Sequence, residues 1–180
     1  YIASKNKPII LSTGMSEEKD LNLAVKTIKK YHSKFGILKC TSKYPASYKD
    51  LNLSSIKKIK KKHNCAVGFS DHTLDDLAAN ISVVFGSTII EKHFKLDKDT
   101  TSIDSHFSVP ISNYQMIKKS LNNVNHCIGN ENLGFKISQE QKNSRRSIYV
   151  SQDIKKNNKL TIENIKSIRP GFGLHPKFFY

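Results

Sequence analysis

Four short apolar runs, each followed at once by small polar residues or a histidine, most constrain what this 180-residue chain can fold into. The runs lie at residues 8–11, 36–40, 65–69 and 87–90. They are largely continuous rather than alternating, which is typical of strands buried on both faces of a parallel sheet. Patterns of helical spacing separate them, so the sequence predicts an α/β fold of four strand–helix units with right-handed crossovers.

Apolar stripes at helical spacing predict a helix after each run. The stripes are Leu21, Ala24, Val25 and Ile28; Leu53, Ile56 and Ile59; Leu74, Leu77, Ala78 and Ile81; and Tyr114, Ile117, Leu121, Val124 and Ile128. We expect Ser16 to cap the first of these helices. Residues 129–143 are polar and contain glycine, which is typical of a linker. Beyond the linker we expect a strand at 146–150, a turn at 153–158 and a short helix capped by Thr161.

Composition narrows the class of protein. No apolar run approaches the roughly 20 residues that cross a bilayer, and the N-terminus lacks the layout of a signal peptide. The three cysteines are odd in number and form no C-x-x-C pair, so we expect reduced thiols. Together these features predict a cytoplasmic protein without a membrane partner.

The net charge of +15 permits an anionic partner. Only Arg145, Arg146 and Arg169 among the 30 basic residues are arginine, whereas nucleic-acid readers favour arginine for bidentate contacts. The lysine run at 57–62 carries an apolar stripe, as a solvated surface helix would. We therefore expect no nucleic-acid partner, and a non-catalytic module that binds glycans or polyanions remains an alternative.

Two histidines follow neighbouring predicted strands. His72 and His93 stand where α/β folds bind their ligands, and side chains from adjacent strand ends can converge on one ion. Neutral imidazole suits divalent metals, and Asp71, Glu91 and Asp104 are the nearby acids. A pair of hydrogen-bonded histidines without a metal is the alternative.

Hydroxyl groups stand at the same level of the predicted sheet. Ser12, Ser42 and Ser70 follow the first three runs and are neutral donors that can hold a phosphate or a carboxylate. The alternative is that they cap the helices that follow. The sequence shows neither a dinucleotide-binding glycine motif nor a P-loop.

Four segments, residues 12–15, 39–45, 68–73 and 90–94, resemble in order and spacing the last four strand ends of the sialic acid synthases. The tail from Arg146 to Gly171 resembles the start of their C-terminal antifreeze-like (SAF) domain. The resemblance implies the C-terminal half, strands 5–8, of a TIM (β/α)8 barrel over residues 1–128. A truncated SAF domain over 144–180 would follow the linker at 129–143.

This family condenses phosphoenolpyruvate with the open aldehyde form of an N-acetylated amino sugar and releases phosphate. The resemblance implies that His72 and His93 hold a catalytic divalent ion, manganese or magnesium. It also implies that Ser12, Ser42 and Ser70 bind phosphoenolpyruvate. Tyr44, Asp104 and Arg169 would contact the sugar, with Asp104 at the reacting centre. Arg169 would reach the partner subunit's site in a domain-swapped homodimer of the full-length enzyme.

The segment from Asp104 to Ser108 reads D-S-x-F-S, which resembles the pseudaminic acid branch of the family. That branch implies 2,4-diacetamido-2,4,6-trideoxy-altropyranose as the acceptor. A neuraminate or legionaminate synthase is the alternative within the family, and a metal-dependent barrel aldolase or hydrolase is the alternative outside it. Because the resemblance covers only half of a barrel, we expect these 180 residues to be inactive alone.

Overall fold

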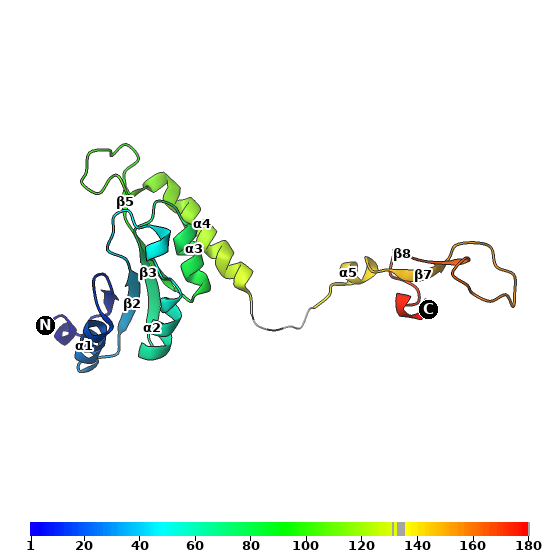
Figure 1. Ribbon diagram of the computed structural model, residues 1–180, viewed down its shortest axis with the longest axis horizontal. Helices are drawn as coiled ribbons and strands as arrows, with labels where there is room; N and C mark the ends of the chain where they lie inside the picture. Colours follow the sequence, from blue (N-terminus) through cyan, green and yellow to red (C-terminus); the bar gives the residue numbers. More distant parts are fainter. Residues whose placement is uncertain (131, 133–135, 180) are drawn as a thin grey trace. The chain divides into compact units, whose positions relative to one another are not determined.

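The structure is a computed structural model that describes residues 1–130, 132 and 136–179. The chain divides into two compact units, Tyr1–Gly129 and Asn130–Tyr180 (Figure 1). Each unit is described by itself.

The first unit is built on a four-stranded parallel sheet in the order β1-β2-β3-β4. Its strands are β1 (Ile9–Ser12), β2 (Phe35–Cys40), β3 (Ala66–Asp71) and β4 (Ile89–Lys92). The four predicted strands are thus confirmed, with ends that differ by one or two residues. The order follows the chain, as expected when each strand feeds a helix that returns alongside it.

Helices alternate with these strands, and the predicted helices are confirmed. They are α1 (Glu18–Lys29), α2 (Ser55–His63), α3 (Leu77–Val84) and α4 (Ile111–Ile128). Ser16 does not cap α1, because its hydroxyl lies 3.4 Å from the Gly14 carbonyl oxygen instead. Glu17 is the N-cap residue, and its backbone N–H donates to the Asp20 carboxylate at 2.9 Å.

Short elements complete the first unit. They are the 3-10 helices η1 (Ala3–Lys5) and η2 (Tyr48–Asp50) and the paired strands β5 (Phe94–Lys95) and β6 (Val109–Pro110). The β5–β6 pair closes the loop between β4 and α4. In the described part of the chain, no helix is long and apolar enough to span a membrane.

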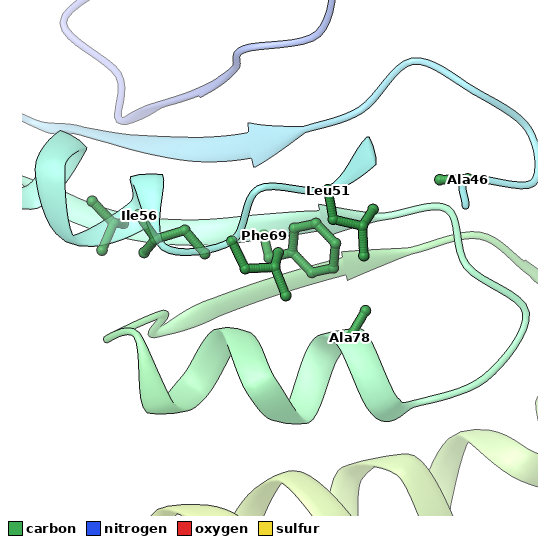
Figure 2. Packing of buried hydrophobic residues seen from close by; sticks show 7 residues of the cluster. Ala46, Leu51, Ile56, Phe69 and Ala78 are labelled. Carbon is green, nitrogen blue, oxygen red and sulfur yellow. The ribbon is translucent and has the colours of Figure 1, made fainter. Parts of the chain in front are cut away.

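The hydrophobic core lies between the sheet and its helices. Phe69 on β3 and Ile56 on α2 are 0% exposed and pack with Ala78 of α3 (Figure 2). A second cluster joins Val25 and Ile28 of α1 to residues of β2, among them Ile37, which pairs in register with Val67 of β3. Residues in register share a face, so α1, α2 and α3 cover one face of the sheet. Each fully buried apolar side chain contributes about 1.5–3 kcal/mol.

The opposite face, which we call the inner face, carries the alternate residues of each strand. Ser12, Leu38, Gly68 and Ile89 are aligned across it by the register of the four strands. Gly68 lies in close contact with both neighbouring strands, because a Cβ atom there would lie 2.5 Å from Leu38 Cδ2 and 2.8 Å from Ile89 Cβ. The curled sheet with helices on one face confirms the predicted α/β class and fits part of a TIM barrel.

The second unit holds a small antiparallel sheet of β7 (Ser147–Val150) and β8 (Ile165–Ile168). The predicted strand near residue 146 is confirmed, and so is the turn at 153–158, where Asn158 N–H donates to Lys155. The prediction of a helix at Thr161 is wrong. The Thr161 carbonyl oxygen accepts hydrogen bonds from the Asn164 and Ile165 amides, and these bonds close a turn that leads directly into β8.

Residues 129–143, expected as a linker, end in the short helix α5 (Gln139–Asn143). Residues 131 and 133–135 of that stretch lie outside the described residues. The second unit ends in the 3-10 helix η3 (Pro176–Phe178), preceded by a bridge between Ile148 and Leu174.

Candidate active site

An aromatic cluster lies where β2, β3 and β4 end. The ring centres of His72 and His93 are 5.3 Å apart, and Tyr44, in the loop after β2, lies 4.2 Å from His72. Phe107 closes the group, with its ring 4.9 Å from His93 and 5.1 Å from Tyr44. The two histidines expected to converge are therefore adjacent, and the predicted sugar-contacting Tyr44 lies beside them.

One nitrogen of His72 is already engaged. The residue is buried, and its Nδ1 lies 2.9 Å from the carbonyl oxygen of Thr41. A carbonyl oxygen only accepts, so Nδ1 carries the proton and the Nε2 lone pair of the neutral ring is left free. This is the arrangement by which proteins orient a metal-binding histidine.

His93 is half-exposed and faces a carboxylate. Its Nδ1 lies 3.7 Å from Oδ2 of Asp104, in the loop between β5 and β6. The structure thus brings Asp104 to the histidines, as expected, although 11 positions separate it from His93 in the chain. A carboxylate here adds negative charge beside any bound cation.

The donor set fits a divalent ion held by two imidazoles. Each imidazole nitrogen binds such an ion at about 2.0–2.1 Å, which places two ring centres roughly as far apart as these are. Across residues 1–130, 132 and 136–179, no group of three or more histidine, cysteine or acidic side chains is arranged to hold a metal. His72 and His93 would therefore be the protein ligands, leaving positions for substrate or water.

The three predicted hydroxyl residues differ in burial. Ser70 is buried on the inner face, and its Oγ donates to Oε1 of Glu91 at 2.6 Å. Ser42 is half-buried, and its hydroxyl lies against the open side of Gly14. Ser12 is exposed and ends β1, where the strand register aligns it with Gly68, the inner-face residue that precedes Ser70 on β3. Glu91, expected only as an acid near the ion, thus orients the Ser70 hydroxyl.

Asp71, expected as one of the acids near the ion, does not face the histidines. It lies on the helix-covered face, where its carboxylate pairs with Lys92. The alternation of a strand predicts this, because Asp71 and His72 are consecutive and point to opposite sides. The partner Lys92 was missed, since a lysine is rarely expected in a buried position.

Arg169 belongs to the second unit. It is exposed and lines a cavity of about 680 Å³ together with Arg145 and Arg146. The Arg146 guanidinium donates to the Ser167 carbonyl at 2.9 Å, which fixes one of the three arginines to β8. This concentration of positive charge suits an anionic or carbonyl-bearing group.

Residues 1–133 of the chain match the model of the NeuB family. The chain belongs to the NeuB family. The expected resemblance to the sialic acid synthases is thereby confirmed.

Relatives within the NeuB family differ in their products. The pseudaminic acid synthase of Campylobacter jejuni is 39% identical over 182 residues, which cover 99% of this chain and 52% of that protein. The N,N'-diacetyllegionaminic acid synthase of Legionella pneumophila is 32% identical over 191 residues, covering 98% and 51%. The chain spans about half the length of these relatives.

A solved NeuB-type structure resembles the fold. The N-acetylneuraminic acid synthetase of Leptospira borgpetersenii, in complex with citrate, aligns with a TM-score of 0.72 at 29% identity. The alignment covers 78% of this chain and 50% of that protein. The homologues are sialic-acid-type synthases, which supports the expectation of an enzyme.

Proposed function

We propose that this chain contributes the metal-binding half of a pseudaminic acid synthase, which condenses phosphoenolpyruvate with an N-acetylated amino sugar and releases phosphate. The observation that carries the proposal is the pair of imidazoles from adjacent strand ends, 5.3 Å apart and bordered by Tyr44 and Asp104. Identity to pseudaminic acid synthases supports it. We expect the 180 residues alone to be inactive, because the chain spans about half the length of its relatives.

In this reaction C3 of phosphoenolpyruvate attacks the sugar aldehyde, water adds at C2 and phosphate leaves. His72 and His93 would hold manganese or magnesium, which supplies Lewis acidity at the aldehyde oxygen and orients the reactants. The Thr41 carbonyl keeps the proton of His72 on Nδ1 and so keeps Nε2 available as a ligand.

Phosphoenolpyruvate would be held by neutral donors. Ser12, Ser42 and Ser70 supply hydroxyls near the inner face, where the oxygens of a phosphate or carboxylate would accept hydrogen bonds from them. The Ser70 hydroxyl donates to Glu91, so donation to phosphoenolpyruvate would require it to exchange partners.

The acceptor we propose is 2,4-diacetamido-2,4,6-trideoxy-altropyranose. Phe107 is 5% exposed and packs on His93 and Tyr44, so it forms an apolar wall that suits a methyl group at C6. Tyr44 and Asp104 would contact hydroxyl or amide groups of the sugar. Neuraminate and legionaminate synthases are the alternatives, and a legionaminic acid synthase is 32% identical to this chain. Turnover of the corresponding acceptor sugars distinguishes the three.

The second unit is proposed as the start of an SAF-type domain. In a domain-swapped homodimer of the full-length enzyme, Arg169 would reach the sugar in the partner subunit's site, where a planar guanidinium can hold a carbonyl or hydroxyl pair. A cytoplasmic location is part of the same proposal, and the three free cysteines of the chain support it.

Metal binding tests the central claim on the 180-residue chain itself. We expect electron paramagnetic resonance to detect one Mn²⁺ site that His72→Ala and His93→Ala each abolish. His126→Ala, which changes an exposed histidine of α4, serves as the control and leaves binding intact. Mn²⁺ binding that is unchanged in His72→Ala would refute the proposed site.

Turnover distinguishes the alternatives. With four preceding strand–helix units supplied in one polypeptide, phosphate release should require both phosphoenolpyruvate and the amino-sugar aldehyde. Turnover of an aldehyde without phosphoenolpyruvate would support the aldolase or hydrolase instead. Salt-sensitive binding to heparin that survives His72→Ala, in a chain without synthase activity, would support the polyanion-binding module.

A further inference from the structure

A buried ion pair lies directly behind the two histidines. Asp71 and Lys92 immediately precede His72 and His93, and they form the last register pair of β3 and β4. Lys92 Nζ lies 2.8 Å from Asp71 Oδ2, and the side chains are 2% and 0% exposed. Consecutive residues of a strand point to opposite faces, so the ion pair lies on the helix-covered face and the histidines project from the inner face.

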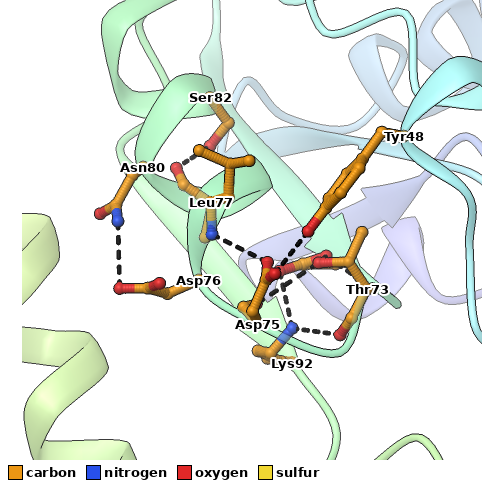
Figure 3. A network of polar contacts seen from close by, with 10 residues as sticks. Tyr48, Thr73, Asp75, Asp76, Leu77, Asn80, Ser82 and Lys92 are labelled. Carbon is orange, nitrogen blue, oxygen red and sulfur yellow. Dashed lines mark hydrogen bonds and ion pairs between the residues drawn. The ribbon is translucent and has the colours of Figure 1, made fainter.

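Thr73 joins the pair into a network (Figure 3). Lys92 Nζ also donates to the Thr73 carbonyl oxygen at 2.6 Å. Oδ1 of Asp71 accepts both the backbone N–H and the hydroxyl of Thr73, each at 2.8 Å. These contacts tie the residues on either side of His72 to each other and to the residue before His93.

The network begins where the backbone pairing stops. The β3–β4 ladder ends at Asp71 and Lys92, and the histidines are the next residues along each chain segment. Beyond the ladder, inter-strand backbone hydrogen bonds no longer set the separation of the two segments. The side chains of Asp71, Lys92 and Thr73 supply that connection.

A role in stability alone does not account for an ion pair at this position. Desolvation of two buried charges offsets most of their attraction, and apolar side chains of similar volume often serve as well or better. Charged and hydrogen-bonded groups fix the relative positions of the segments that carry them, because hydrogen bonds form only within a narrow range of distances and angles.

We propose that Asp71 and Lys92 are positioning residues that fix the separation of the His72 and His93 imidazoles. The chemical purpose of that separation rests on the proposed function, in which both rings hold one ion. The separation itself is a property of the chain without metal, so it can be measured independently.

The test uses the double variant Asp71→Asn/Lys92→Met in the 180-residue chain. It removes both charges together, so no unpaired charge is buried, and the asparagine oxygen retains the hydrogen bonds from Thr73. Glu18→Gln/Lys58→Met makes the same chemical change in an exposed pair between α1 and α2 and is the control. Circular dichroism and thermal unfolding verify that each variant folds.

The first measurement is the nuclear Overhauser effect between the ring protons of His72 and His93 in the metal-free chain. We expect it in the parent and the control and expect at least a threefold loss in the double variant. The second is Mn²⁺ affinity, which should fall about 10- to 100-fold, as for other groups that orient metal ligands. An unchanged ring contact in a folded double variant would overturn the proposal.

The outcomes separate this inference from the proposed function. If the ring contact depends on the pair but the parent binds no Mn²⁺, the positioning role stands and the metal site fails. If the parent binds Mn²⁺ and the folded variant binds it equally, the positioning role fails. Should the double variant not fold, Lys92→Arg decides, because it keeps the positive charge but changes the geometry of the contacts with Asp71 and the Thr73 carbonyl. A ring contact unchanged in a folded Lys92→Arg would then overturn the proposal.

Discussion

Gly68→Ala should strongly destabilise the first unit. A Cβ atom at Gly68 would lie 2.5 Å from Leu38 Cδ2, 2.8 Å from Ile89 Cβ and still closer to the Ile89 carbonyl oxygen. Carbon atoms pack best at about 3.5–4.0 Å, so the neighbours must open by about 1 Å. The Leu38 side chain is 1% exposed and lacks room to move, and the Ile89 carbonyl belongs to the backbone of β4.

Overpacking of this kind costs about 1–3 kcal/mol, and we expect about 3 kcal/mol here because backbone must move. Chemical denaturation followed by circular dichroism measures the difference. Gly36→Ala on β2 is the matched control, since its Cβ would meet Ile89 Cδ1 at 3.3 Å and Ala66 atoms at 3.4 Å and 3.5 Å. It should cost less than about 1 kcal/mol. Equal losses in the two variants would refute the reasoning.

Two further predictions concern the core. Burial, together with the nearby charges of Lys62 and Lys29, lowers the pKa of His63 in the folded chain. The stability that neutral His63 contributes is therefore fully present above about pH 6.5 and is lost as the pH falls through its pKa in the folded chain. His63→Gln should reduce the loss in free energy of unfolding between about pH 7.5 and 5. Parallel stability profiles of the parent and the variant would contradict this. Phe69→Ala should cost about 3–5 kcal/mol in denaturant unfolding, because the ring is 0% exposed, whereas the exposed Phe94→Ala should cost under about 1 kcal/mol. Similar losses for the two phenylalanines would be inconsistent with the described core.

Much of the fold was predictable because its signals are local. The four apolar runs mark the strands, and the polar residues that end them mark the edge where His72 and His93 meet. Helix starts were less predictable, since Ser16 and Glu17 are both plausible caps and the turn geometry selects between them. Near Thr161, the Asn164 side chain accepts the Thr161 N–H and closes a turn rather than a helix.

The contacts that shape the candidate site depend on residues distant in the chain. Thr41 and His72 are 31 positions apart, and Asp71 and Lys92 are 21 apart. Local patterns give the residue types at such positions but not which of them meet. The resemblance to a family supplied Tyr44, whereas the pairing of Lys92 with Asp71 is visible only in the folded structure.

The alternation of β3 has an evolutionary consequence. Val67, Phe69 and Asp71 serve the helix-covered face, while Gly68 and Ser70 serve the inner face, so one strand carries two largely separate sets of requirements. Under the proposed function, substitutions at inner-face positions would change the contacts with the ligand while the packing behind them is kept. A one-residue insertion in β3 would instead turn the packing residues to the inner face and the inner-face residues into the core, so this strand tolerates substitution better than a change of length.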